Sequence, residues 1–303
     1  MRRRFFLIVN PGAGIAGSPL VEDTVRALER AGASVTRATP ENAGASRAAA
    51  RQAAGSGRYD AIVAAGGDGT IRHVAAGLIG ADTPLGIIPV GTANVLALEI
   101  GLAPRPEAVQ RMLLDGPSVA VSCARANGEP FLLMAAAGFD ARVLAGLDQR
   151  IKSRIGKVAY AGPVLGALAR PIDTLTVAVD GRHHEANWAV IANARHYGGR
   201  FVMAPRTGIQ QRGLQAILFK ARSRPVLIGQ LMSLAVGRLD ARATSRGDVA
   251  MLPCSRATIA AHRPVPTQLD GDVFGATPLE VEDGAGEIGL IVPGPSSTGN
   301  PGR

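Results

Sequence analysis

Short apolar runs alternate with helical stretches over about the first 115 residues, and this alternation indicates an α/β arrangement around a parallel sheet. Strands are predicted at Phe5–Val9, Ser34–Thr39, Ala61–Ala65 and Leu85–Pro89. Helices are predicted at Pro19–Ala31, at Ala43–Ala54, from Thr70 to about Leu78, and after Asn94. The basic start before Phe5 resembles a signal peptide, but the apolar run stops after five residues. We therefore predict a buried first strand there.

Three glycine-rich segments follow predicted strands, at the edge of the sheet where open α/β folds bind ligands. They are Gly12–Gly17, Gly66–Thr70 and Val90–Asn94. In the second segment, the glycines let backbone N–H groups approach phosphate oxygens, and the following helix adds the positive end of its dipole. A carboxylate at Asp68 would repel bare phosphates. Its presence makes chemical sense if it holds Mg²⁺ or accepts a proton from an attacking hydroxyl.

The first glycine-rich segment, Gly12–Gly17, has the G-x-G-x-x-G spacing of a dinucleotide-binding turn. Such a turn is usually accompanied by an acidic residue near the end of the second strand, which holds a ribose hydroxyl. Thr36–Thr39 contains no acidic residue, although Arg37 could hold a 2′-phosphate. A dehydrogenase therefore stays open as an alternative, as does a turn without a ligand. The chain has no Walker A sequence, which excludes a P-loop enzyme.

The pattern changes after Pro117, and the second half of the chain is predicted to be mainly β. Strands are expected at Val119–Ala124, Phe131–Ala137, Thr174–Val179, Trp188–Asn193, Leu214–Lys220, Ala257–Ala261 and Leu279–Val281. Helices are expected at Ala141–Ala169, with a break near Gly156, and at Pro225–Gly237. The 303 residues fit two domains, predicted at 1–117 and 118–293, followed by a disordered tail at 294–303.

Composition and charge exclude several classes of protein. Aromatic residues make up 4% of the chain, so no stacking platform for nucleic acid is expected. Cys123 and Cys254 fit no metal-ligand spacing, which excludes a zinc site and a disulfide framework. The net charge of +9 suits an anionic membrane or a phosphorylated ligand, and is also compatible with a merely solvated surface. No apolar run is long enough for a transmembrane helix.

The glycine-rich segments belong to a longer ordered series of motifs. Its members are Asn10–Gly14, Gly66–Thr70, Pro89–Asn94, Gly138–Ala141, Lys152 with Gly156-Lys157 and Tyr160, and Leu269–Asp272. The series resembles the catalytic family of diacylglycerol kinases and sphingosine kinases, and the resemblance extends from residue 5 to about residue 293. Gly-Gly-Asp-Gly alone is shared with NAD kinases and phosphofructokinases, so the order of the motifs carries the resemblance.

The resemblance implies a Rossmann-like parallel-sheet N-terminal domain and a C-terminal β-sandwich that receives the lipid, with nucleotide in the cleft between them. It implies ATP- and Mg²⁺-dependent phosphorylation of a diacylglycerol-like or sphingoid-like hydroxyl, in phospholipid biosynthesis. The residues implied to line the nucleotide are Asn10, Pro11, Gly12, Ala13, Gly14, Thr39, Gly66, Gly67, Asp68, Gly69, Thr70, Thr92 and Asn94.

Three aspartates are the catalytic residues that the resemblance implies. Asp68 would lie beside the phosphates, Asp272 would accept the proton, and Asp270 would share metal or base duties. Asp68 and Asp270 would be the ligands of the catalytic Mg²⁺. Two nearby carboxylates suit this chemistry, because one can stay ionised while the pKa of the other rises. Without the family context, Asp270-Gly271-Asp272 is a plain hairpin turn.

Three positions depart from the pattern of the family. Gln211–Gln215 has no carboxylate where bacterial members often hold a structural Mg²⁺, so no metal is predicted there. Arg72 and His73 replace the usual Asn-Glu, and Val95 replaces an acidic residue that many members have. These changes bear on lipid specificity and on the level of activity.

The expected partner is a lipid substrate at an anionic membrane surface, with no nucleic acid and with a homodimer left open. The expected location is cytoplasmic and peripheral at the inner membrane surface. Apolar segments near Ala159–Ala169 and Leu227–Val236 either border an acyl-chain pocket or pack in the core. A soluble-substrate kinase of the NAD kinase type is the second hypothesis. A catalytically silent protein that binds lipid or nucleotide is the third.

Overall fold

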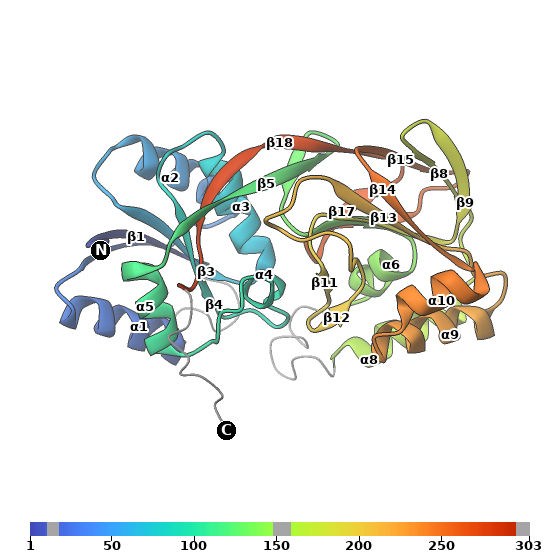
Figure 1. The fold of residues 1–303 in the computed structure, drawn as a ribbon, viewed down its shortest axis with the longest axis horizontal. Helices are drawn as coiled ribbons and strands as arrows, with labels where there is room; N and C mark the ends of the chain where they lie inside the picture. Colours follow the sequence, from blue (N-terminus) through green and yellow to red (C-terminus); the bar gives the residue numbers. More distant parts are fainter. Residues whose placement is uncertain (11–17, 148–158, 295–303) are drawn as a thin grey trace, which may run out of the picture.

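The four apolar runs of the first half form a parallel sheet in the order β2-β1-β3-β4. The computed structural model describes residues 1–10, 18–147 and 159–294. The strands are β1 (Arg4–Val9), β2 (Ser34–Ala38), β3 (Ala61–Gly66) and β4 (Leu85–Pro89), in the left half of Figure 1. Every residue of β3 and β4 is buried, which explains why these strands are apolar at successive positions. The predicted parallel sheet is confirmed.

Five helices of the described chain accompany this sheet, and several begin at recognisable sequence signals. They are α1 (Pro19–Arg30), α2 (Ala43–Gly55), α3 (Asp68–Leu78), α4 (Val95–Glu99) and α5 (Pro106–Asp115). Proline stands at the start of α1 and α5, where its missing N–H costs nothing. The Asn42 side chain caps α2 by accepting the N–H of Ala45 at 2.9 Å. The sequence pattern did not predict α5.

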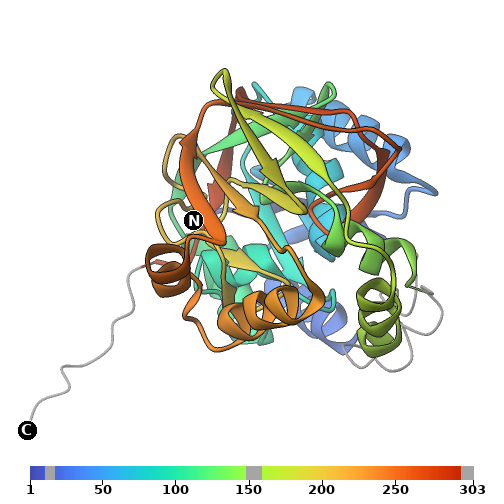
Figure 2. The same cartoon turned by 90° about the vertical axis from the view of Figure 1, so that its right-hand side faces the viewer.

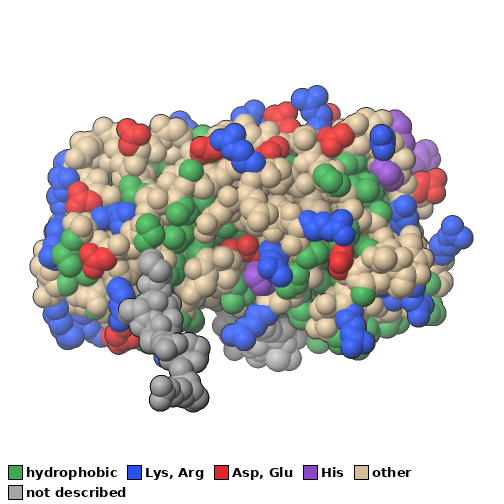
Figure 3. All heavy atoms as spheres, in the orientation of Figure 1, with side chains coloured by type: hydrophobic (Ala, Val, Ile, Leu, Met, Phe, Trp, Pro, Cys, Tyr) green, Lys and Arg blue, Asp and Glu red, His purple; other side chains and the backbone are tan. Residues whose placement is uncertain are grey.

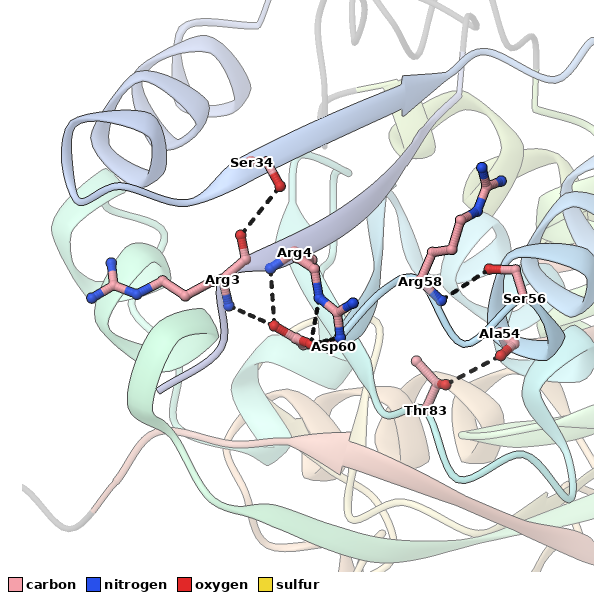
Figure 4. Close-up of polar contacts among 8 residues, drawn as sticks. All are labelled: Arg3, Arg4, Ser34, Ala54, Ser56, Arg58, Asp60 and Thr83. Atoms are coloured by element: carbon pink, nitrogen blue, oxygen red, sulfur yellow. Dashed lines mark hydrogen bonds and ion pairs between the residues drawn. The ribbon is translucent and has the colours of Figure 1, made fainter.

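Asp60 fixes the start of β1, as Figure 4 shows. Its carboxylate accepts the backbone N–H groups of Arg3 at 2.7 Å and Arg4 at 3.0 Å, and also the Arg4 guanidinium at 2.7 Å. Burial raises the pKa of Asp60, but these hydrogen bonds outweigh burial and lower the pKa overall. The basic start of the chain therefore leads into an interior strand, paired with β2 and β3, as predicted.

The second half of the chain is a β-sandwich, as predicted, and occupies the right half of Figure 1. One of its sheets has the order β14-β13-β10-β7-β16-β17. Its strands are β7 (Met134–Ala137), β10 (Trp188–Ala192), β13 (Leu214–Phe219), β14 (Val249–Cys254), β16 (Pro266–Leu269) and β17 (Asp272–Ala276). Alternate residues of β10 serve two cores, because Ala189 and Ile191 pack between the sheets while Trp188 and Val190 pack on the other side.

The opposing sheet is continuous with the parallel sheet of the first half. Its strands are β5 (Ser118–Ala126), β6 (Glu129–Phe131), β8 (Leu175–Val179), β9 (Arg182–Ala186), β15 (Arg256–Ala261) and β18 (Leu279–Ile291). β18 begins beside β15, runs along β5, and ends parallel to β4, where Leu290 lies opposite Leu85. The expected strand at Leu279–Val281 is therefore only the first part of a 13-residue strand that joins both halves.

Two predicted elements are each divided in the structure. In the described parts of the expected helix Ala141–Ala169, the structure has α6 (Phe139–Ala145) and α8 (Ala161–Ala169), and the expected break near Gly156 lies outside the described residues. The expected strand Phe131–Ala137 is divided between β6 and β7. The division has a physical cause, because the N–H groups of Leu132 and Leu133 bond to a side chain instead of a strand.

Helices and short strands cover the outer face of the six-stranded sheet. The helix expected at Pro225–Gly237 is α9 (Arg224–Ala235). It is followed by α10 (Leu239–Arg246), and a small hairpin pairs β11 (His196–Tyr197) with β12 (Phe201–Val202). Neither α10 nor this hairpin was predicted. Within the described ranges, no helix is long and apolar enough to cross a membrane.

Candidate functional site

The glycine-rich turns after β3 and β4 lie against each other. A Cβ added at Gly91 would lie 2.5 Å from the Cα of Gly67, so the two backbones need the absence of a side chain there. Asn94 holds the second turn by accepting the N–H of Gly91 at 2.8 Å and donating to its carbonyl at 2.9 Å. The Asn10 side chain donates to the Thr70 hydroxyl at 2.8 Å, which joins the end of β1 to the same place.

Most of the predicted nucleotide residues therefore meet at one edge of the sheet. Among the described nucleotide residues, Thr39 is the exception. It is exposed just after β2 and forms no hydrogen bond with these turns. Pro11, Gly12, Ala13 and Gly14 lie outside the described residues, as do Lys152 and Gly156-Lys157 of the motif series.

Asp68 begins α3 and connects the two glycine-rich turns. Its carboxylate accepts the N–H groups of Val95 at 3.0 Å and Leu96 at 3.1 Å, at the start of α4. Burial raises the pKa of Asp68; the two hydrogen bonds act in the opposite direction, and the charge of Asp272 adds to the rise. The Asp272 carboxylate lies against Gly69, the residue that follows Asp68, which explains how its charge reaches Asp68.

Asp270 and Gly271 form a two-residue hairpin turn between β16 and β17. Both residues have positive φ, 49° and 87°, which is the conformation that Asp-Gly favours in tight hairpins. One carboxylate oxygen of Asp270 accepts the N–H of Leu132, and the other accepts those of Leu133 and Met134, all at 2.9 Å. Burial raises its pKa to about 6, although the Arg72 charge and these bonds oppose the rise.

This arrangement gives Asp270 a positioning role. Its two oxygens are occupied by backbone N–H groups, so it anchors the hairpin that carries Asp272 to the segment between β6 and β7. The hairpin interpretation and the family interpretation of this segment are compatible, because the turn is what presents Asp272. Three backbone N–H groups occupy part of the acceptor capacity of the Asp270 carboxylate, which also lines the cavity described below, and its expected share of metal and base duties stays a prediction.

Asp272 lies directly over Gly69, and its side chain is 48% exposed. A Cβ at Gly69 would overlap the carboxylate, so glycine is what permits this approach. The Arg72 guanidinium lies 3.6 Å from the Asp272 carboxylate and 3.1 Å from Nε2 of His73. Burial and the Arg72 charge lower the pKa of His73. Arg72, which replaces the Asn usual in the family, is thus a buried cation beside the predicted proton acceptor.

An elongated cavity of about 440 Å³ begins at these turns and extends along the six-stranded sheet. Asp68, Thr92 and Gly271 line its polar end, and Trp188 lies on its floor, stacked on Phe219 with ring centroids 4.0 Å apart. Asp140, Gln268 and Asp270 also line it, and the rest of the wall is mainly apolar and comes largely from α6, α9 and the start of α8, including Val143, Leu144, Tyr160, Val164, Leu231, Leu234 and Ala235. The segments near 159–169 and 227–236 therefore border a pocket, which is one of the two roles left open by the sequence.

Asp140 supplies a polar group inside the apolar part of the cavity. Its carboxylate accepts the Gln268 amide at 3.1 Å and the Tyr197 hydroxyl at 3.3 Å, and burial raises its pKa to about 6. Among the described residues, no Lys or Arg forms an ion pair with it. The sequence placed Asp140 in the Gly138–Ala141 motif without giving it a role, and gave no sign that Gln268 and Tyr197 would meet it.

Replacing Asp140 with Asn should change how the free energy of unfolding depends on pH. The folded-state pKa of about 6 lies above the ordinary value of about 3.9, so the folded protein holds the Asp140 proton more tightly. The resulting stability is full below pH 4 and is lost as the pH rises through 6. The amide of the variant stays neutral, so urea unfolding from pH 4 to 7 should show the unfolding free energy of the unchanged protein falling relative to that of Asp140→Asn by up to about 3 kcal/mol.

The matched control for this measurement is Asp82→Asn, which changes an exposed carboxylate outside the cavity. Its unfolding free energy should run parallel to that of the unchanged protein over the whole pH range. Parallel curves for Asp140→Asn as well would show that the Asp140 carboxyl does not titrate with a raised pKa.

The segment Gln211–Gln215 uses its polar side chains in protein contacts. The Gln215 amide oxygen accepts the N–H of Arg206 at 3.2 Å, and Arg212 pairs with Glu287 at 2.5 Å. The absence of a metal at this segment stays a prediction.

Family models match almost the whole chain. Residues 4–126 match the model described as diacylglycerol kinase catalytic domain, and residues 134–293 match the model described as YegS C-terminal NAD kinase beta sandwich-like domain. A solved structure of a diacylglycerol kinase from Bacillus anthracis str. Sterne superposes with a TM-score of 0.74 at 21% identity, covering 96% of this chain and 97% of that one. This likeness concerns the fold.

Two curated proteins are similar in sequence over shorter stretches. Lipid kinase YegS of Escherichia coli (strain K12) is 31% identical over 185 residues, which are 57% of this chain and 60% of that protein. Uncharacterized protein sll0036 of Synechocystis sp. is 29% identical over 235 residues, 73% of this chain and 52% of that protein. The chain therefore spans only about half to three fifths of the length of these relatives. On the two family models, the chain belongs to the family that combines a diacylglycerol kinase catalytic domain with a YegS C-terminal NAD kinase beta sandwich-like domain.

Proposed function

We propose that this protein is a lipid kinase that transfers the terminal phosphoryl group of ATP to a lipid hydroxyl and requires Mg²⁺. One observation carries the proposal: the apolar cavity of about 440 Å³ opens at its polar end onto Asp68 and Thr92 of the glycine-rich turns. A hydroxyl at the head of a lipid in this cavity would face the place where the turns present backbone N–H groups. The volume lies within the range of small-molecule sites.

The turns suit the phosphates of a nucleotide. Gly66, Gly67 and Gly91 let Thr70 and the two turns pack closely, and α3 begins at Asp68 with the positive end of its dipole. Asn10 and Thr70 add polar groups from β1 and α3. These residues would hold and orient ATP.

The acidic groups near the turns also fit Mg²⁺. In the described residues, no three His, Cys, Asp or Glu side chains form a ready-made metal site. Mg²⁺ commonly uses only one or two carboxylates and completes its shell with waters and substrate phosphates. Asp68 and Asp272 are the pair that could supply them. Bound there, Mg²⁺ would neutralise charge on the phosphate oxygens.

Asp272 is the residue we assign to proton transfer. Its half-exposed carboxylate can accept the proton of the lipid hydroxyl as the hydroxyl oxygen bonds to phosphorus and the bond to ADP breaks. The raised pKa of Asp68 supports a division of labour, because the two carboxylates have different environments. The Arg72 guanidinium, 3.6 Å away, helps to hold the Asp272 carboxylate in place.

The lipid would be diacylglycerol-like or sphingoid-like. The aromatic and aliphatic wall of the cavity can bury an acyl or alkyl chain, and burial of apolar surface stabilises binding by about 25 cal/mol per Å². Asp140, Gln268 and Tyr197 give the lipid head one place to form hydrogen bonds within this wall.

The test is to incubate the purified protein with labelled ATP, with and without Mg²⁺, and with a panel of diacylglycerols, sphingoid bases and NAD. A labelled lipid that forms only with Mg²⁺ is the expected product. Labelling of NAD with every lipid inert would instead establish a soluble-substrate kinase of the NAD kinase type. Nucleotide or lipid binding without any transfer would establish a silent binding protein.

Replacing Leu234 with Trp should separate lipid binding from nucleotide binding. Leu234 lines the cavity from α9, so an indole there would occupy space that the lipid needs. It is distant in sequence from the glycine-rich turns. The KM for the lipid should rise at least about tenfold, as expected for the loss of one well-packed apolar contact. The KM for ATP should stay within about twofold. Leu20→Trp, a half-buried position on α1, is the control. An unchanged lipid KM would mean that the lipid binds elsewhere.

A further inference from the structure

Helix α8 has an unusual surface. All nine of its residues are apolar, AGPVLGALA, yet none is fully buried, and Leu165 is 68% exposed. A helix that is apolar all round normally lies inside a protein or a membrane. Among the described residues, nothing fully buries any side chain of α8.

Helix α9 continues the same surface. Ile228, Met232 and Val236 are 46%, 58% and 61% exposed, and their spacing of four residues places them in one stripe along the helix. The Arg224 guanidinium donates to the carbonyl of Ala169 at 2.7 Å, which ties the start of α9 to the end of α8. Figures 1 and 2 show both helices along the same lower edge of the molecule.

These side chains, together with the 42% exposed Phe201 of β12, form what we call the apolar face: Leu165, Phe201, Ile228, Met232 and Val236. The inner sides of the same elements line the cavity, through Val164, Leu231 and Ala235. Phe201 belongs to both, so it lies at the boundary between the cavity and the apolar face. A lipid could pass from a layer covering this face into the cavity with little exposure to water.

The charged residues within the segments that carry the apolar face are arginines, and the acidic Asp240 that follows on α10 is paired with Arg206. Exposed arginines stand at the ends of its elements: Arg170, Arg200, Arg222, Arg224 and Arg238. The segments 159–171, 195–204 and 221–239 contain no Asp or Glu. Figure 3 shows basic and hydrophobic side chains next to one another along the lower right of the molecule, where α8, α9 and α10 lie in Figure 1. A partner must therefore be apolar in its middle and anionic at its surface.

We propose that the apolar face docks on a bilayer that contains anionic lipid. Apolar side chains would enter the headgroup boundary while the arginines contact lipid phosphates. A second copy of the chain fits less well, because a symmetric contact through this face would bring the same arginines close to each other. The purpose of the docking, delivery of substrate to the cavity, rests on the proposed function, whereas the docking itself does not.

Flotation of the full-length protein with vesicles tests this proposal without nucleotide. The protein should float with vesicles of phosphatidylglycerol and phosphatidylcholine, and much less with phosphatidylcholine alone. Binding should weaken as salt shortens the Debye length from about 10 Å at 0.1 M to about 3 Å at 1 M. The double variant Leu165→Asp/Met232→Asp should lose at least about tenfold in binding, with an unchanged melting temperature. Val273→Asp, which charges a 53% exposed apolar residue on β17, should bind like the unchanged protein.

The arginines are tested by a matched pair of charge changes. Arg222→Gln/Arg238→Gln should weaken binding to the anionic vesicles by about fivefold for each arginine removed. Arg30→Gln/Arg51→Gln, which removes the same charge from exposed positions on α1 and α2, should bind like the unchanged protein. Equal losses for both pairs would mean that net charge alone governs binding, and would overturn the assignment of this face.

Three other results would overturn the proposal. The first is equal flotation with neutral and anionic vesicles at every salt concentration, and the second is normal flotation of the Leu165→Asp/Met232→Asp variant. The third is a protein that is dimeric in solution and becomes monomeric in this variant. The proposed function is judged separately. If the protein floats through this face but shows no kinase activity, the docking proposal stands and the proposed function is wrong. If the protein is an active kinase but the Leu165→Asp/Met232→Asp variant floats normally, the proposed function stands and the docking proposal is wrong.

Discussion

Replacing Asp272 with Asn should lower kcat by about 10²–10⁴-fold while the affinity for ATP changes little. The amide keeps the size of the side chain and its place over Gly69, but it cannot accept the proton of the lipid hydroxyl. Phosphoryl transfer depends mainly on positioning and charge neutralisation, so some turnover should remain. Steady-state kinetics together with ATP binding by calorimetry would measure the two quantities side by side.

Two further variants make this result specific. Asp82→Asn changes an exposed carboxylate away from the turns and should leave kcat unchanged. Asp270→Asn should mainly lower the unfolding free energy, because it weakens hydrogen bonds to three backbone N–H groups in a buried position. Near-normal turnover of Asp272→Asn would mean that the proton goes elsewhere, and Asp68 would become the leading candidate.

The parallel sheet could be predicted because burial on both faces makes its central strands β3 and β4 nearly continuous apolar runs. A continuous apolar run does not predict the length of β18. Its middle contains Glu282, Asp283 and Gly284, a combination typical of a turn, and the predicted strand ended before them. In the structure this segment forms a bulge in the pairing with β5, between Glu282 and Gly286, and the strand continues to Ile291. The partner strand, rather than local propensity, determines the length of β18.

Part of the candidate site could likewise be predicted and part could not. The sequence placed Asp68 and Asp272 in motifs, and the structure brings them close together. The anchoring of Asp270 depends on N–H groups up to 138 residues away in the chain, which no local pattern reveals. Arg72 looked like a simple departure from the family pattern, yet its side chain is only 7% exposed and lies against Asp272. Such contacts follow from the meeting of α3 with the β16–β17 hairpin.

Replacing Gly69 with Ala should lower kcat at least about tenfold without destabilising the fold. A methyl group at this position would overlap the Asp272 carboxylate. The carboxylate ends a short, half-exposed side chain, so it can move away into solvent while the backbone stays in place. Alanine also favours a helix over glycine by about 1 kcal/mol, and Gly69 is the second residue of α3. The melting temperature should therefore stay equal or rise while turnover falls.

The double variant Gly69→Ala/Asp272→Asn identifies the cause of that fall. If the methyl group acts by displacing Asp272, the double variant should be no slower than Asp272→Asn alone, since the displaced group is already absent. Additive losses in log kcat would mean instead that Gly69 serves the phosphates through its own backbone. Gly55→Ala, at the end of α2 where an added Cβ meets nothing within 4 Å, should leave kcat unchanged. Gly69 would then serve to leave room for the Asp272 carboxylate, and not to stabilise the helix.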